Sequence, residues 1–78
     1  MSELLAYLAR ELVDEPDAVR VETEERDEGV VFVLHVAEGD VGKVIGRNGR
    51  IARALRTLVR ASSPRDGRRV FVEIADPE

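Results

Sequence analysis

Residues 41–51 read Val41-Gly42-Lys43-Val44-Ile45-Gly46-Arg47-Asn48-Gly49-Arg50-Ile51, and this stretch decides the fold of the 78-residue chain. Two glycines, Gly46 and Gly49, frame two polar residues. Glycine permits positive φ angles and lets another part of the backbone approach closely. The apolar pair before the first glycine can anchor the loop to a core. The pattern therefore predicts a short helix from residue 41, a G-x-x-G loop at 46–49 and a second helix from about residue 49.

The chemistry of this loop suits a sugar-phosphate backbone. The second glycine opens a helix, and the free N–H groups and positive dipole end of a helix favour phosphate oxygens. Arg47 and Asn48 add one cationic and one neutral donor at the tip, and Lys43 and Arg50 flank the loop with further positive charge. G-x-x-G by itself is a weak motif, because any two packed helices can be joined by such a turn. A purely structural turn therefore stays open as the alternative.

The helix predicted over residues 49–61 has two distinct faces. At about 100° per residue, one sector holds an apolar stripe and the opposite sector holds arginines. The stripe consists of Ile51, Ala54, Leu55, Leu58 and Val59, and the arginines are Arg53, Arg56 and Arg60. Arg50 and Arg53 lie within about a turn of the loop, so they are the better candidates for nucleic-acid contact. Arg56 and Arg60 fit an ordinary solvated surface.

The rest of the chain alternates helix and strand patterns. Apolar residues at helical spacing predict an amphipathic helix over 3–14, which Pro16 brings to an end. Alternation of apolar and polar residues predicts a strand over 19–24 with one buried and one solvent-exposed face. A β-branched run predicts a more buried strand over 30–36. Asp40 can cap the short helix that begins at residue 41. Residues 62–67 predict a loop, and residues 70–74 predict a last strand.

This order, helix-strand-strand-helix-helix-strand, predicts an α+β fold with helices on one face of a three-stranded sheet. If the last strand lies beside the second strand, the two should run parallel, because a two-helix crossover joins them.

Charge is unevenly divided along the chain. The net charge is −4, yet residues 1–40 carry a balance of −9 and residues 41–78 a balance of +5. Six basic residues and no acidic residue lie between Val41 and Arg60. Such asymmetry indicates an anionic partner for the second half, although a merely solvated basic helix would look the same.

Several functional classes find little support. The chain has no cysteine, which excludes disulfides and cysteine-based metal sites. No apolar run approaches the roughly 20 residues of a membrane helix, and the first residues lack a signal-peptide pattern. The single histidine, His35, fits a strand, and the acidic residues show no ligand spacing. We therefore expect a cytoplasmic protein that is not an enzyme and uses no cofactor, metal or small-molecule substrate.

The segment Val44-Ile45-Gly46-Arg47-Asn48-Gly49, in this order of elements, resembles a KH domain of the type II arrangement. The chain is similar to the small bacterial single-KH proteins of the KhpA family, most closely over residues 40–46, 49–52 and 54–56. The resemblance covers nearly the whole chain. It implies a single KH domain over residues 1–78 with a three-stranded mixed sheet. It also implies that the loop clamps about four nucleotides.

The resemblance further implies an RNA-binding protein of the RNA-chaperone type, which grips single-stranded RNA. It implies a homodimer, or a heterodimer with a larger KH-containing protein, and a role in cell elongation and envelope growth. The expected RNA-binding residues are Lys43, Ile45, Gly46, Arg47, Asn48, Gly49, Arg50 and Arg53. Among possible base contacts, the apolar residues Val44, Ile45 and Ile51 fit a core role better. Phe32 and Phe71 are also expected in the core, so base stacking should be minor.

Two alternatives to RNA binding stay open at this point. The domain could be a protein–protein adaptor in which the loop is only structural and the acidic first half prefers a basic partner. It could also bind single-stranded DNA, because the loop chemistry contacts phosphate rather than the 2′-hydroxyl.

Overall fold

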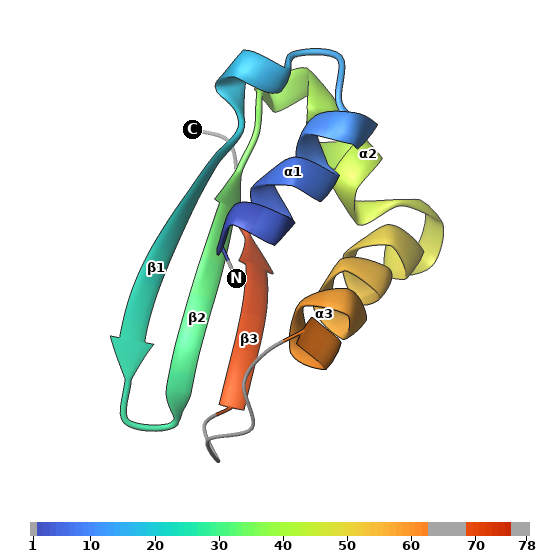
Figure 1. The fold of residues 1–78 in the computed structure, drawn as a ribbon. Coiled ribbons are helices and arrows are strands. Elements are labelled where there is room, and N and C mark those ends of the chain that lie inside the picture. Colours follow the sequence, from blue (N-terminus) through green and yellow to red (C-terminus); the bar gives the residue numbers. More distant parts are fainter. Residues whose placement is uncertain (1, 63–68, 76–78) are drawn as a thin grey trace.

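The structure is a computed structural model that describes residues 2–62 and 69–75. Its elements follow the predicted order and form an α+β fold (Figure 1). The helices are α1 (Ser2–Leu12), α2 (Val41–Ile45) and α3 (Arg50–Ser62), and the strands are β1 (Arg20–Arg26), β2 (Gly29–His35) and β3 (Arg69–Ile74). Single 3-10 turns at Pro16–Ala18, Glu38–Asp40 and Arg47–Gly49 connect them. The predicted loop after residue 62 lies outside the described residues.

The three strands form one mixed sheet in the order β1-β2-β3. β1 and β2 are antiparallel, with Thr23 opposite Phe32. β2 and β3 are parallel, with Phe32 opposite Val72, so the predicted parallel pair is confirmed. Because β2 and β3 are parallel neighbours, the chain must cross from the end of β2 to the start of β3, and α2 and α3 form this crossover.

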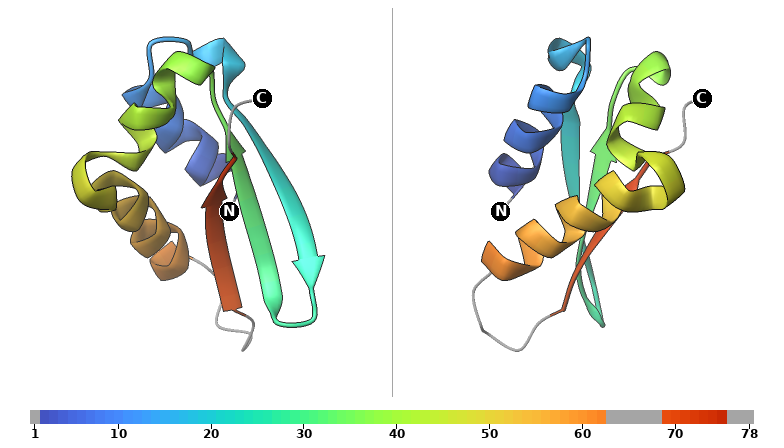
Figure 2. Two further views of the ribbon diagram at one scale, coloured as in Figure 1. Left: turned by 180° about the vertical axis from the view of Figure 1, so that it is seen from behind. Right: turned by 90° about the vertical axis from the view of Figure 1, so that its right-hand side faces the viewer.

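All three helices pack on one face of the sheet, which leaves the other face open when the molecule is seen from behind (Figure 2). Side chains alternate along a strand, so every second residue of β2 points to the helices. Leu34 is fully buried in this layer, and Phe32 is 7% exposed. The buried cluster consists of Leu5, Ala6, Ala9, Val19, Phe32, Leu34, Val44, Leu55, Val59 and Val72.

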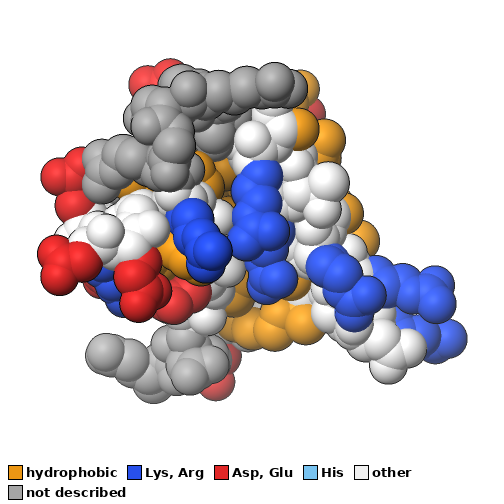
Figure 3. All heavy atoms as spheres, turned by 90° about the horizontal axis from the view of Figure 1, so that it is seen from below, with side chains coloured by type: hydrophobic (Ala, Val, Ile, Leu, Met, Phe, Trp, Pro, Cys, Tyr) orange, Lys and Arg blue, Asp and Glu red, His pale blue; other side chains and the backbone are white. Residues whose placement is uncertain are grey.

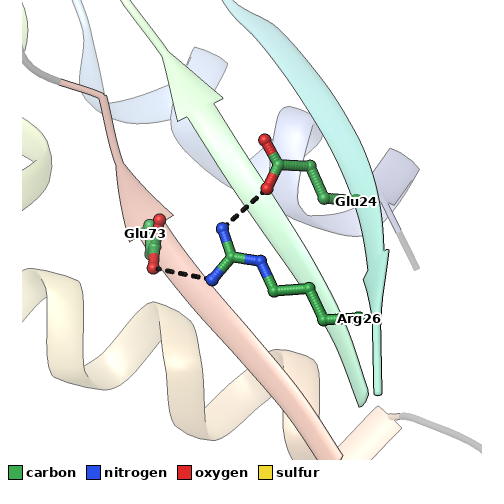
Figure 4. A network of polar contacts seen from close by, with 3 residues as sticks. All are labelled: Glu24, Arg26 and Glu73. Atoms are coloured by element: carbon green, nitrogen blue, oxygen red, sulfur yellow. Dashed lines mark hydrogen bonds and ion pairs between the residues drawn. The ribbon is translucent and has the colours of Figure 1, made fainter. Parts of the chain in front are cut away.

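The open face of the sheet carries charged side chains over a thin apolar layer. Arg26 lies between two carboxylates, 2.7 Å from Glu24 and 3.9 Å from Glu73 (Figure 4). The hydrogen bond to Glu24 raises the pKa of Arg26. Val31 lies on this face and is only 2% exposed. The open face is thus covered by its own salt-bridged side chains, although such exposed pairs add little stability.

The structure corrects three details of the prediction. Helix α1 ends at Leu12 rather than residue 14. Phe71 is half-buried and lines a shallow pocket on the open face instead of joining the core cluster. In the predicted stripe of α3, Leu58 is 49% exposed and Ala54 is exposed as well. The stripe is wider than the surface that the rest of the molecule covers, because a groove between α1 and α3 leaves Ala54 and Leu58 uncovered.

Candidate nucleic-acid interface

The loop between α2 and α3 has the backbone conformation that its glycines suggest. Gly46 ends α2 with φ 74°, and its N–H donates to the carbonyl of Gly42 at 2.9 Å. Asn48 and Gly49 also have positive φ, 58° and 73°. Asparagine is one of the few residues other than glycine that tolerates this region. Three left-handed residues within four positions turn the chain sharply and let α3 begin at Arg50.

The two residues at the tip of the loop are exposed. Arg47 and Asn48 both face solvent, next to the first turn of a 13-residue helix. The guanidinium of Arg53 donates to the backbone carbonyl of Asn48 at 3.0 Å. Arg53 therefore holds the loop from the helix side. Since a guanidinium has five N–H donors, the rest of the group stays available to a ligand.

The apolar residues around the loop divide into core and surface. Val44 is fully buried, and Ile51 is half-buried against the core. Ile45 is 37% exposed and lies directly before Gly46. The core role expected for Val44 and Ile51 is confirmed. Ile45, for which a core role was also expected, is instead an accessible apolar side chain beside the glycine loop.

Lys43 is held by two carboxylates. Its Nζ lies 3.1 Å from Asp14 and 3.4 Å from Asp40. The hydrogen bond and charge of Asp14, followed by those of Asp40, raise the pKa of Lys43. Its positive charge is therefore largely balanced within the protein, in contrast to the exposed arginines near the loop. Sequence spacing identified the lysine but gave no signal that Asp14, two residues after the end of α1, would reach it.

Asp40 is buried, with 2% of its surface exposed. The prediction that its side chain caps α2 is wrong, because the carboxylate accepts no capping hydrogen bond from the first turn of that helix. Its Oδ2 accepts the backbone N–H of Glu15 at 3.0 Å. Burial alone would raise the pKa of this carboxyl, but the backbone N–H of Glu15 and the neighbouring backbone N–H of Asp14 lower it. Lys43 adds to this effect, and the pKa of Asp40 lies below its ordinary value of 3.8. Asp40 thus ties the segment after α1 to the start of α2.

Positive charge gathers along α3. Arg50, Arg53, Arg56 and Arg60 are all exposed. Seen from below, Lys and Arg side chains run from the centre of the molecule to its right-hand edge, and most of the Asp and Glu side chains lie to the left (Figure 3). The separation of charge in the sequence is therefore also a separation in space.

A three-stranded mixed sheet with helices on one face, and a G-x-x-G loop between two of them, defines the class of KH domains. The chain belongs to the KhpA/KhpB KH-domain family, whose family model matches residues 2–74.

Curated relatives agree with this assignment. A protein of Treponema pallidum named "RNA-binding protein KhpA" is 55% identical over 95% of this chain and 92% of its own length. Proteins of the same name from Caldanaerobacter subterraneus and Borreliella burgdorferi are 49% and 45% identical over 95% of this chain, and over 99% and 90% of their own lengths. No solved structure matches the chain.

Proposed function

We propose that this chain is a single KH domain over residues 1–78 that binds single-stranded RNA through the loop at 46–49. One observation carries the proposal. The loop exposes Arg47 and Asn48 at the start of a long helix that has four arginines and no acidic residue. The relatives named RNA-binding proteins support the same ligand. The proposed RNA contacts are the eight residues predicted above: Lys43, Ile45, Gly46, Arg47, Asn48, Gly49, Arg50 and Arg53. Lys43 should contribute least to RNA affinity, because Asp14 and Asp40 already balance its charge.

The test is a pair of substitutions at the tip, Arg47→Asp with Asn48→Asp. Both side chains are exposed, so the fold should survive, and a circular dichroism spectrum and a urea midpoint check that it does. The double variant should lose most of its affinity for a fluorescein-labelled oligouridylate at low salt. If affinity is unchanged in the folded variant, the loop is not the binding site. Competition with a matched oligodeoxynucleotide separates RNA from single-stranded DNA as the ligand.

We also propose that the domain acts with a second KH chain, either another copy or a larger KH-containing protein. An apolar groove between α1 and α3 supports this. Leu58 and Leu12 are 49% and 37% exposed and line the same groove, and adjoining exposed apolar side chains are typical of interaction sites. The groove is lined by Leu8, Glu11, Leu12, Ile51, Ala54, Leu55 and Leu58. A second RNA-binding loop in the same particle would raise avidity without any new contact.

Sedimentation velocity tests the self-association. Leu58→Asp places a charge in the groove and should shift the protein to monomer. Tyr7→Asp is the matched control, because Tyr7 is 58% exposed on α1 but does not line the groove. If wild-type protein sediments as a monomer, mixing with a larger KH protein of the same cell tests the heterodimer. Association without any RNA binding would instead favour a protein–protein adaptor.

A biological role as an RNA chaperone in the cytoplasm, in cell elongation and envelope growth, follows only from the resemblance to the family, and we propose it on that basis. Deleting the gene and measuring cell length tests it, with the loop double variant supplied back. If the variant restores normal length as fully as the wild type, the role does not require the loop.

A further inference from the structure

We propose that the outer face of α3 is a second phosphate-binding surface, which extends the RNA site beyond the loop. This arginine track consists of Arg53, Arg56 and Arg60. The inference rests on the proposed RNA binding at the loop, and it adds a longer single strand as the preferred ligand. Sequence alone left Arg56 and Arg60 as ordinary solvated residues.

The geometry of the track is regular. At about 100° per residue, the three arginines fall within a sector of about 60° on one side of the helix. From Arg53 to Arg60 the helix rises by about 10 Å. A stacked strand advances about 3.4 Å per nucleotide. The track therefore has room for about three nucleotides beyond the four or so that a KH loop clamps.

Two of the guanidinium groups are held in place by the backbone. Arg53 donates to the carbonyl of Asn48 at 3.0 Å, and Arg60 donates through Nε to the carbonyl of Val70 at 3.1 Å. A neutral carbonyl does not cancel the charge. No other described residue pairs with the remaining N–H groups of these two guanidinium groups, and planar donors of this kind match phosphate oxygens. The track is thus partly pre-organised for phosphate rather than a set of freely moving side chains.

The charges around the track are also favourable. Within residues 2–62 and 69–75, the ion pairs of the acidic side chains lie on the open sheet face and around Lys43, away from these arginines. Arg56 forms no hydrogen bond or ion pair with any residue in those ranges. The track lies on the opposite side of α3 from Leu58, so pairing through the apolar groove would leave it accessible.

Length dependence of binding tests the proposal. Labelled oligouridylates of about 4, 8 and 12 nucleotides are titrated into the full chain at several salt concentrations. If the loop bound alone, an 8-mer would gain only the statistical factor of about five registers for a site of about four nucleotides. We expect a larger gain between the 4-mer and the 8-mer. We also expect Arg56→Gln with Arg60→Gln to reduce that gain to the statistical factor.

The salt slope gives a second measurement. Each lost phosphate contact should reduce the slope of log K against log salt by about 0.7, so the double variant should lose about 1.4. Arg56→Gln alone should lose about half of this, without the Val70 hydrogen bond being touched. Arg10→Gln is the matched control, because Arg10 is exposed in the last turn of α1.

The outcomes separate the two proposals. If the loop variant loses binding but Arg56→Gln with Arg60→Gln keeps the wild-type affinity and slope for the 8-mer, the arginine track is wrong and the loop site stands. If the loop variant binds every oligouridylate as the wild type does, the proposed function itself fails.

Discussion

At the scale of single residues, Gly46 is the position that the loop needs most. Its φ of 74° is unfavourable for any residue with a Cβ, and a Cβ here would lie 3.0 Å from the backbone N of Ile51. The two constraints are independent, because one is local and the other comes from the return of α3 against the loop. The glycine therefore serves both the turn and the close approach of the next helix.

A glycine-to-alanine series separates these effects. Gly46→Ala should cost about 2 kcal/mol or more, from the left-handed backbone and the contact with Ile51. Gly49→Ala has open space around its Cβ and should cost only the backbone term, about 1 kcal/mol. Gly42 lies in α2, and a Cβ added there would meet no atom within 4 Å. Gly42→Ala should therefore raise the free energy of unfolding by about 0.5 kcal/mol. Urea unfolding measures all three, and equal effects at Gly46 and Gly42 would contradict the assigned geometry.

Lys43 is the second residue-scale case. Because two carboxylates within 3.4 Å balance its charge, Lys43→Gln should reduce the salt slope of RNA binding by much less than the value of about 0.7 expected for a phosphate contact. Arg47→Gln should show the full reduction. Asp14→Asn should raise the affinity, since it releases part of the charge of Lys43. Equal losses in the Lys43 and Arg47 variants would mean that Lys43 leaves its carboxylates to contact RNA.

At the scale of elements, Asp40 links the segment after α1 to the start of α2. Its carboxylate accepts the N–H of Glu15 after α1 and lies 3.4 Å from Lys43 within α2. These contacts hold the start of α2 in place, and the G-x-x-G loop follows the other end of α2. The position of the loop therefore depends on a contact between residues 25 apart in the sequence.

The lowered pKa of Asp40 predicts a dependence of stability on pH. A carboxyl whose pKa is below 3.8 in the folded state contributes stability above that value and loses it as pH falls through the folded-state pKa. Asp40→Asn should therefore destabilise the protein at neutral pH. Its difference from the wild type should shrink below about pH 4. Urea midpoints across this pH range measure it.

Asp17→Asn is the control for this experiment, because Asp17 is exposed in the 3-10 turn Pro16–Ala18. At alkaline pH the dependence runs the other way, because stability contributed by Lys43 falls as pH rises. The pKa of Lys43 is raised above 10.5, so its contribution is complete below that pH and is lost as pH rises through the folded-state value. A difference between Asp40→Asn and the wild type that stays constant through the acid range would contradict the assigned contacts.

At the scale of the whole molecule, one small core has to hold the sheet and all three helices. A domain of this size has a free energy of unfolding of about 4–12 kcal/mol. Leu34 lies at the centre of that core, on the middle strand, and is fully buried. Leu58 belongs to the predicted apolar stripe of α3 but is half exposed.

Leu34→Ala should therefore cost about 2–5 kcal/mol, a large part of the total stability. Leu58→Ala should cost under about 1 kcal/mol in the isolated chain. Thermal and urea unfolding measure both. A similar loss for the two variants would indicate that Leu58 is buried in solution, as expected if the chain self-associates through the apolar groove.

Charge is also arranged at this scale. The salt-bridged carboxylates of the open sheet face lie away from α3, so the molecule has one side rich in negative charge and one rich in positive charge. A net charge of −4 conceals this division. The orientation of a bound strand would thus follow from the fold as a whole rather than from the loop alone.

The sequence by itself determined the order of the elements and the position of the loop, because these follow from local periodicity and from the conformational needs of glycine. The mixed sheet was expected from the family resemblance, because residue patterns alone left open which strand the last strand would join. Strand ends shifted by one or two residues, because pairing with the neighbouring strand, and not the apolar pattern, sets where a strand begins and ends. Only the tertiary structure showed which positions of the α3 stripe are covered, because that depends on how far α1 reaches.

Only the tertiary structure, likewise, brought Asp14 to Lys43 and the backbone N–H of Glu15 to Asp40, and placed Arg69 so close to Gly29 that a Cβ on Gly29 would meet the carbonyl of Arg69. Those contacts join residues that are distant along the chain. Their pairing depends on the packing of whole elements, which no local pattern of residues records.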